Sequence, residues 1–432
     1  MTPRSSTLAR KAGTPSLARQ VLWVALGLCA SGTALALCSP STTNRPVCPA
    51  AAAAETASFI DPTASIASSQ RVSLDKQVYI GPFAAISASG TVSIGKKTNL
   101  QDSVGVTGSG TVTLGDEVIL AHGAQVRAPS RVGRKEVVGE HNAAFVGFNS
   151  LIDRATVEHD AMVLHLARVA PGIVIKHGKV VLSGKNIATQ AEADNVALGK
   201  VVPITEALRE FMEGVLHVNE TFAREYTNLF RDNASNVRGI NFDPGRSDFN
   251  PVRDLPTLAG VATRDPSHRN RIIGDVSLAD SREVLNADDD EQVVGNFISL
   301  RADEGEPFHV GHIARMRDRT TFHALEHTGL HLHDHVNYGF RSLVHGGQSA
   351  ATQNNPHFNT VVGDGTRIGD HAVVFRSVLG AGVSIGCGSL VDGSTLPAGT
   401  VVPARTIVVN FGHANASTYA VEWNPGCSTG AK

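Results

Sequence analysis

The sequence predicts a mainly β protein with two left-handed parallel β-helix domains, the first followed by a long amphipathic α-helix. Three observations support this fold class. Apolar residues recur every six positions over two long stretches, and many of them are followed by glycine. Between these stretches, around residues 205–230, the apolar spacing changes to alternating steps of three and four. The repeat of six then resumes after about residue 271, which indicates an internal duplication.

A period of six distinguishes strands from helices. On an α-helix, steps of six rotate by about 600° and scatter the apolar residues in several directions. On a strand, six is an even number, so all of these residues point to the same face. A short strand and a tight turn then form one side of a triangular prism, and three hexapeptides form a coil of about eighteen residues. Such left-handed coils are an exception to right-handed crossover. A β-sandwich would instead need hairpin turns every eight to twelve residues, and the sequence lacks them.

The N-terminus predicts export. A basic start precedes an apolar run from Val21 to Leu35, and Ala34 and Ala36 form a small-x-small cleavage site. We therefore expect a signal peptide over residues 1–36 and a periplasmic or extracellular protein. An uncleaved membrane anchor remains the alternative, although the run is shorter than the ~20 residues that a membrane span needs.

Charge and cysteine content restrict the function classes. The 38 basic and 40 acidic residues are nearly balanced, which argues against a nucleic-acid or acidic-membrane partner. Export would leave Cys38, Cys48, Cys387 and Cys427 in an oxidising compartment. There the sequence is compatible with either a Cys38–Cys48 disulfide or free thiols. None of the four forms a CxxC pair, so a thiolate zinc site is not expected.

Along the chain, a linker over 37–58 leads into the first β-helix, which with its helix covers 59–230. Its coils end near Gln190, and the helix is expected from Thr205 to Phe230. The six-residue series of this half are Ile80–Ile86, Ile94–Leu100–Val106–Val112, Leu114–Leu120–Val126–Val132–Val138 and Leu151–Val157–Val163–Val169–Ile175. The helical stripe consists of Leu208, Phe211, Val215, Val218 and Phe222.

A polar linker over 231–270 separates the first half from a second β-helix over 271–412. Its repeat is looser and is followed by an irregular tail over 413–432 without a second amphipathic helix. The series of this half are Val294–Leu300, Val310–Met316–Phe322 and Val362–Ile368–Val374.

Two histidines of the second half share one position in the repeat. His323 and His345 each directly follow an inward apolar residue, so both point out of the prism. They are 22 residues apart, which equals one coil plus a four-residue bulge near residues 327–331. The spacing therefore predicts that they stack in adjacent coils and share a metal. The alternative is a surface histidine cluster, because eleven of the eighteen histidines lie after residue 308.

Several motifs resemble the gamma class of carbonic anhydrases, and the resemblance covers most of residues 59–230 and 271–410. In the first half they are Ile80–Ile86, Asn99–Asp102, Leu120–His122 and Gln190–Asp194. In the second half they are Arg301–Gly305, His323–Glu326 and Val344–Gly346.

The resemblance implies a metal site that two β-helices share. In that family three β-helices pack as a trimer, and each metal is bound by two histidines of one subunit and one of the next. The first half keeps His122, which corresponds to the histidine that comes from the neighbouring subunit. It has Thr107 and Arg127 at the positions of the other two ligands. The second half keeps His323 and His345, and Phe340 stands at the position of the histidine from the neighbouring subunit. The losses are complementary, so the two domains together would complete one His₃ site for zinc, iron or cobalt.

The resemblance also implies the chemistry, which is the reversible hydration of CO₂ to bicarbonate by a metal hydroxide. Glu326 would be the proton shuttle and Glu304 the carboxylate nearer the metal. Gln101 would hydrogen-bond the metal-bound solvent, and Asn219 would orient CO₂ or bicarbonate. The interface salt bridges would involve Arg301, Asp303, Asp102 and Asp318.

Two other functions remain open. A carbonic-anhydrase-like scaffold with decayed sites would explain Thr107, Arg127 and Phe340, and a hexapeptide acyltransferase would share the fold. The expected partners are CO₂ and bicarbonate, and further copies of the chain or a related gamma-class subunit. No membrane contact is expected after signal cleavage.

Overall fold

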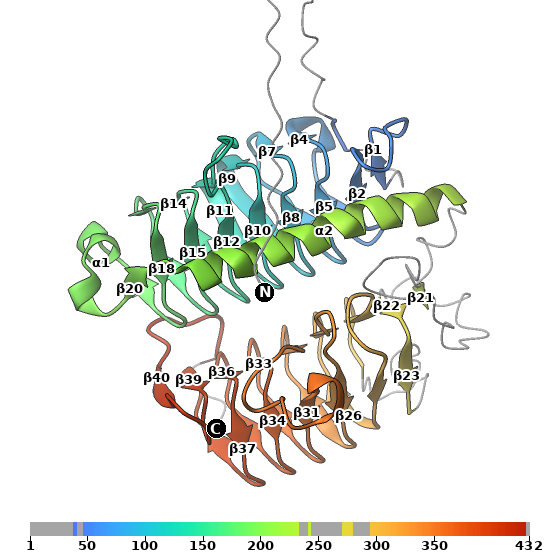
Figure 1. The fold of residues 1–432 in the computed structure, drawn as a ribbon, viewed down its shortest axis with the longest axis vertical. Helices are drawn as coiled ribbons and strands as arrows, with labels where there is room; N and C mark the ends of the chain where they lie inside the picture. Colours follow the sequence, from blue (N-terminus) through green and yellow to red (C-terminus); the bar gives the residue numbers. More distant parts are fainter. Residues whose placement is uncertain (1–37, 41–45, 233–240, 243–269, 280–293, 429–432) are drawn as a thin grey trace, which may run out of the picture. The chain divides into compact units, whose positions relative to one another are not determined.

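The first half of the chain winds into stacked coils of short parallel strands, which Figure 1 shows in blue to green. The structure is a computed structural model and describes residues 38–40, 46–232, 241–242, 270–279 and 294–428, all within the unit Leu37–Lys432. One sheet contains β1 (Val47–Cys48), β2 (Ser58–Ile60), β5 (Tyr79–Ile80), β8 (Asn99–Leu100), β10 (Val118–Leu120), β12 (Ala144–Val146), β15 (Ala161–Val163), β18 (Lys179–Val181) and β20 (Val201–Pro203).

The other strands of this half form one eleven-stranded sheet, because β9 and β11 are long enough to turn a corner of the prism. Its members are β3 (Ser65–Ile66), β4 (Val72–Leu74), β6 (Ala85–Ile86), β7 (Val92–Ile94), β9 (Gly105–Leu114), β11 (Gln125–Val132), β13 (Leu151–Asp153), β14 (Thr156–Val157), β16 (Arg168–Val169), β17 (Val174–Ile175) and β19 (Asn186–Ile187).

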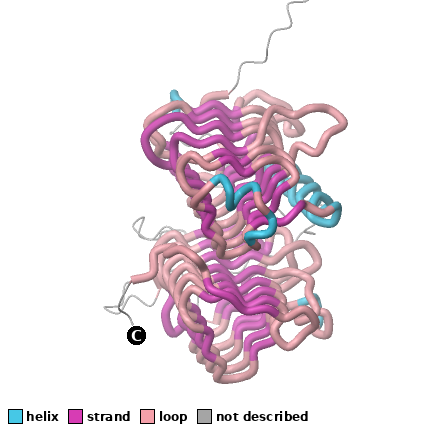
Figure 2. Tube along the Cα trace, turned by 90° about the vertical axis from the view of Figure 1, so that its left-hand side faces the viewer, coloured by secondary structure: helices cyan, strands magenta, loops and turns pink. Residues whose placement is uncertain are grey.

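The second half repeats the architecture with three separate sheets. Figure 2 shows the strands of both halves in magenta, stacked in layers that loops connect. The first sheet contains β21 (Asn241–Phe242), β22 (Arg271–Gly274), β24 (Ser299–Ala302), β27 (Thr321–His323), β30 (Leu343–His345), β33 (Val373–Phe375), β36 (Leu390–Asp392), β39 (Thr406–Val409) and β40 (Ser417–Ala420). The second contains β23 (Val276–Leu278), β25 (Phe308–Val310), β28 (Leu330–Leu332), β31 (Thr360–Val362), β34 (Val378–Leu379) and β37 (Thr395–Leu396). The third contains β26 (Ile313–Met316), β29 (Val336–Tyr338), β32 (Arg367–Ile368), β35 (Ser384–Ile385) and β38 (Val401–Val402).

The predicted fold class is therefore confirmed, but the interior register differs from the prediction at two residues. Val138 is 91% exposed because residues 133–143 leave the coil as a loop. Leu151 is not the inward residue of its strand, since its neighbour Ile152 is in register with Val126 and Val169 of the core. The step to Val157 is thus five residues, not six.

Glycine after an inward residue has a steric role. A Cβ on Gly95 would overlap the backbone of Gly115 in the next coil, so stacking at this corner excludes side chains. The left-handed positions near Gly95 belong to other residues, Lys97 and Glu117, with φ values of 58° and 59°. Close approach of successive coils therefore requires glycine at position 95, whereas Gly133, after inward Val132, has a positive φ of 70°.

Helix α2 (Glu206–Asp232) covers the first sheet of the first half, as Figure 1 shows, and contacts β2, β5 and β10. The shorter α1 (Gln190–Asp194) follows the last coil and begins with a capping box between Thr189 and Glu192. Of the described helices, none combines the length and apolar character that a membrane span requires. The expected signal peptide lies outside the described residues. Of the expected 231–270 linker, the structure describes residues 231–232, which end α2, residues 241–242 and Asn270.

An apolar cluster between the two halves joins them into one body. The first sheet of each half and α2 contribute to this cluster, and the residues that each half contributes are almost fully buried. Its members are Ile119, Ala121, Ala143, Phe145, Phe148, Met162, Leu166, Val180, Met212, Leu216, Leu343, Val373, Phe375, Leu390, Ile407 and Val421.

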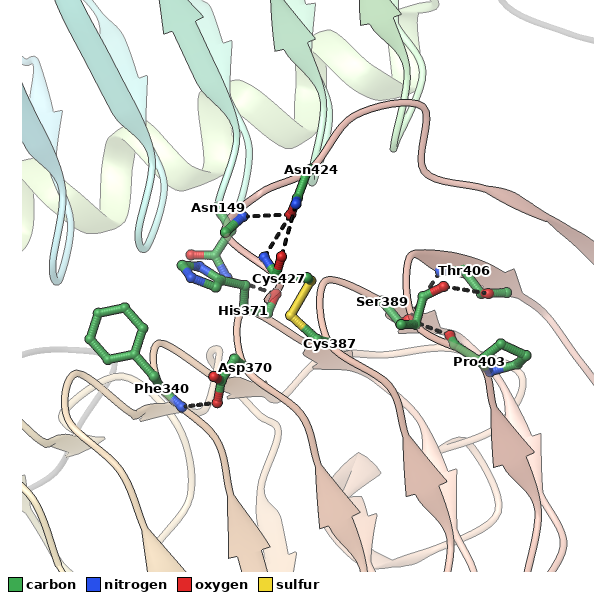
Figure 3. Close-up of a disulfide and its surroundings, with 12 residues drawn as sticks. Asn149, Phe340, Asp370, His371, Cys387, Ser389, Pro403, Thr406, Asn424 and Cys427 are labelled. Carbon is green, nitrogen blue, oxygen red and sulfur yellow. Dashed lines mark hydrogen bonds between the residues drawn. A yellow bond between two sulfur atoms is a disulfide. The ribbon is translucent and has the colours of Figure 1, made fainter. Parts of the chain in front are cut away.

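The C-terminal tail is ordered, contrary to the irregular tail that we expected. β40 pairs antiparallel with β39, and the following residues contact the first half. The Glu422 N–H donates to the Gly184 carbonyl, and its carboxylate accepts from Lys185 and Lys200. A Cys387–Cys427 disulfide ties the end of this tail to the second half, as Figure 3 shows. Cys38 and Cys48 form a second disulfide.

Candidate metal centre

His122, His323 and His345 lie together where the two halves meet. His323 and His345 end the neighbouring strands β27 and β30 and are in direct register, as their spacing of 22 predicted. His122 follows β10 in the first half. The side chains are 2–3% exposed, and one nitrogen of each imidazole lies within 4.8 Å of the other two. Among the described residues, this is the one group of three such side chains that could hold a metal.

The outer nitrogens of these rings face oxygen atoms. His345 Nδ1–H donates to the Gly346 carbonyl at 2.8 Å. His122 Nδ1 lies 3.5 Å from Asp102 Oδ1, and His323 Nε2 lies 3.4 Å from Glu304 Oε2; neither nitrogen makes a hydrogen bond. Metal-binding histidines usually have such an oxygen behind the ring, which fixes its orientation. The arrangement therefore fits three imidazole ligands whose other nitrogens face a common point.

The protonation state also fits metal binding. Burial, together with the charge of Arg301, lowers the pKa of His323 well below its usual value. Burial and nearby His122 do the same to the pKa of His345. His122 Nε2 and His323 Nδ1 are 3.0 Å apart, so at least one of these two nitrogens accepts rather than donates. Neutral imidazole is the form that binds a divalent metal.

A buried arginine links the halves beside this group. Arg301 is fully buried and pairs with Asp102 of the first half and Asp303 of its own half, each at 2.7 Å. Burial alone would raise the pKa of Asp102, but Arg301 and His122 outweigh it and lower this pKa. The Tyr226 hydroxyl of α2 donates to Asp303. Tyr226 lies four residues beyond Phe222 on the predicted helical stripe, so the sequence contained a signal for it.

Asp318 does not take part in the interface, contrary to the prediction. Its Oδ1 accepts the Asn296 backbone N–H within the second half, and it makes no ion pair with any described residue. A second buried link between the halves lies elsewhere, where Arg271 Nη2 contacts Asp61 Oδ2 at 2.9 Å. The hexapeptide pattern gives no sign of this pair, because the two residues are 210 positions apart in the sequence and the pattern reports only local spacing.

The two predicted catalytic carboxylates are adjacent. Glu304 is 5% exposed, and burial raises its pKa to about 8. Its Oε1 accepts the Glu326 backbone N–H at 3.1 Å. The Glu326 side chain is 36% exposed and lies 3.2 Å from exposed His327. One carboxyl thus lies against His323, and the next reaches solvent.

An apolar cavity of about 440 Å³ opens onto His345. Gln101 and Asn219 both line it, together with Glu304. Asn219 is 3% exposed and its Nδ2 donates to the Val215 carbonyl, whereas its Oδ1 has no hydrogen-bond partner. The rest of the lining is mostly aromatic and aliphatic. Phe211, Val215 and Val218 come from the predicted helical stripe, but nothing in the sequence indicated that the following residues belong to the site: Ala121, Phe145, Phe148, His165, Leu325 and Phe375.

His165 is a buried imidazole in this wall that the repeat pattern did not reveal. Its Nδ1 accepts the Phe148 N–H at 3.0 Å, and its ring stacks on Phe148. Burial lowers the pKa of His165 to about 4. Since the unfolded chain takes up this proton near pH 6.5, the stability that His165 contributes is present above that pH and is lost as pH falls towards 4.

We therefore expect His165→Asn to flatten the acid side of the stability profile. Between pH 6.5 and 4.5, the metal-free wild type should lose about 2 kcal/mol more of its unfolding free energy than the variant. Urea denaturation at several pH values measures both slopes, and His141→Asn, at an exposed histidine of the same half, is the control. Equal slopes in wild type and His165→Asn would refute this assignment.

Comparison with known proteins gives one partial sequence match. No family model matches the chain. A carbonic anhydrase from Methanosarcina thermophila is 29% identical over 156 residues, which are 34% of this chain and 57% of that protein. The chain thus spans little more than half the length of this relative.

Solved structures with some likeness include a hexapeptide transferase family protein and putative acetyltransferases. A hexapeptide transferase family protein from Anaplasma phagocytophilum is 20% identical, with 40% of this chain and 93% of that chain covered and a TM-score of 0.18. A putative acetyltransferase from Desulfovibrio desulfuricans is 12% identical, with 83% and 71% covered and a TM-score of 0.25. Scores this low support no argument about function.

Proposed function

We propose that this protein is a gamma-class carbonic anhydrase that hydrates CO₂ reversibly at a metal centre shared by its two β-helices. The observation that supports it best is the group of three buried histidines, to which the first half contributes one and the second half two. The partial likeness to a carbonic anhydrase supports the same reaction.

In this proposal His122, His323 and His345 hold one divalent metal, with zinc the first candidate and iron or cobalt also suited to three imidazoles. A metal with three imidazole ligands and an open position lowers the pKa of bound water to about 7, which supplies a nucleophile at neutral pH. The apolar cavity beside His345 suits CO₂, a molecule without charge or hydrogen-bond donors.

The remaining residues orient the substrate and move the proton. Gln101 and Asn219, whose Oδ1 has no hydrogen-bond partner, line the cavity and would orient the substrate. Glu304, whose Oε2 lies 3.4 Å from His323 Nε2, takes a proton at the centre, and Glu326, whose N–H donates to Glu304, passes it to solvent at the exposed turn. We further propose that the mature protein is exported and that further copies, or a related subunit, pack against it.

Stopped-flow measurement of CO₂ hydration tests this function. We expect hydration well above the buffer rate, loss of that activity on treatment with a chelator, and recovery on addition of zinc or iron. A folded protein that takes up no metal and does not accelerate hydration would instead be the scaffold that the sequence left open.

A further inference from the structure

A second cavity borders His122, whereas the apolar cavity borders His345. It has a volume of about 210 Å³ and shares no lining residue with the apolar cavity. Both halves form its wall, and most of the lining is polar. The residues are Ser103, His122, Gly123, Asn149, Arg319, Thr321, Arg341, Ser342 and Leu343.

Two arginines give this cavity a positive charge. Arg319 and Arg341 are 22 residues apart, the same spacing as His323 and His345, and both occupy the left-handed turn position of their coils, with φ values of 63° and 55°. Like-charged residues at matching positions of adjacent coils repel one another. The pKa of Arg341 is lowered to about 10, by burial and then by the charge of Arg319.

Among the described residues, neither guanidinium forms an ion pair, whereas the nearby Arg317 pairs with Asp370 at 2.7 Å. The charge of Asp318 acts on Arg319 without forming an ion pair. Each guanidinium lies over an aromatic ring, Arg319 over Phe297 and Arg341 over Phe340, and Arg341 Nη2 lies 3.5 Å from the Ser103 carbonyl oxygen. Buried charges are normally paired, so two half-buried arginines that line one cavity favour a bound counter-charge.

The first half supplies an unused hydrogen-bonding group. Ser103 is 3% exposed, and its Oγ has no hydrogen-bond partner. Asn149 holds the opposite rim in place, because its Nδ2 donates to the carbonyls of Arg341 and His371, each at 3.2 Å. The cavity thus combines two cations of one β-helix with a free hydroxyl of the other.

We propose that Arg319, Arg341 and Ser103 bind a small inorganic anion, of the size of chloride or bicarbonate, at the interface between the two β-helices. The narrow cavity, lined by nine residues, suits a small anion better than a nucleotide or a sugar phosphate. The bound anion neutralises the two arginines and bridges the halves. This site does not depend on the proposed carbonic anhydrase activity.

Crystals of the full chain soaked in sodium bromide test the proposal directly. We expect an anomalous bromide peak between the Arg319 and Arg341 guanidinium groups, which bicarbonate added to the soak should remove. Well-ordered side chains around the cavity with no bromide peak between them would overturn the proposal.

Thermal unfolding supplies the matched test in solution. At constant ionic strength, replacing gluconate by chloride should raise the Tm by about 2 °C per tenfold increase in chloride above the dissociation constant. Arg341→Met should abolish this rise, and Ser103→Ala, a milder change, should weaken it. Arg317→Met, at an exposed ion pair, should retain it. Equal chloride dependence in the wild type, Arg341→Met and Ser103→Ala would contradict the assignment.

Discussion

Replacing His122 with alanine is expected to abolish metal binding, although this residue is about 200 positions away from the other two histidines. The two that remain, His323 and His345, would leave a divalent ion with two imidazoles in place of three. Loss of even an outer hydrogen-bond partner of a metal ligand typically costs 10–100-fold in affinity or activity, so loss of the ligand itself should exceed about 100-fold. Metal content per chain and the rate of CO₂ hydration measure both effects.

The control for this experiment is His141→Ala. His141 is an exposed histidine of the same half, 3.6 Å from Glu213, and its loss should leave metal content and activity unchanged. Circular dichroism and gel filtration would show that both variants fold. A His122→Ala protein that retains one equivalent of metal would place the metal elsewhere.

The second large effect is expected from Arg301→Met, which should destabilise the protein by about 3–5 kcal/mol. The guanidinium is fully buried between Asp102 and Asp303, so its removal leaves two buried carboxylates without a counter-charge. Because Asp102 belongs to the first half, this loss also weakens contact between the β-helices. Urea denaturation of the metal-free protein measures the change.

Arg317→Met is the matched comparison for this substitution. Arg317 pairs with Asp370 at the surface, where such pairs contribute about 0–1 kcal/mol. Adding Asp102→Asn to Arg301→Met should recover part of the lost stability, because one unpaired charge disappears. If Arg301→Met unfolds within 1 kcal/mol of the wild type, Arg301 does not hold the interface together.

The sequence predicted the parts of the fold that repeat locally. A period of six specifies which side chains enter the prism, and it also placed His323 beside His345. It failed at Val138 and Leu151, because a repeat pattern cannot show where the chain leaves a coil or shortens a step. The ordered tail was missed for a related reason, since β40 has no repeat and depends on pairing with β39.

Contacts between the halves were harder to predict. The family resemblance showed that each half lacks the histidines that the other half keeps. This was the basis for predicting that His122 shares a metal site with His323 and His345. Nothing local to Asp61, Arg271 or His165 shows what covers them, so these residues emerged only from the structure. Asp318 was assigned to the interface through the resemblance alone, but within this chain its Oδ1 accepts the Asn296 N–H of its own half.

The central claim is that one metal is held by imidazoles from both β-helices. X-ray absorption at the K-edge of the metal, on zinc- or iron-loaded full-length protein, tests it most directly. We predict a first shell that includes three imidazole nitrogens at about 2.0–2.2 Å in the wild type, and two at most in His122→Ala. A wild-type shell made of oxygen or sulfur, or one unchanged by loss of His122, would contradict the account.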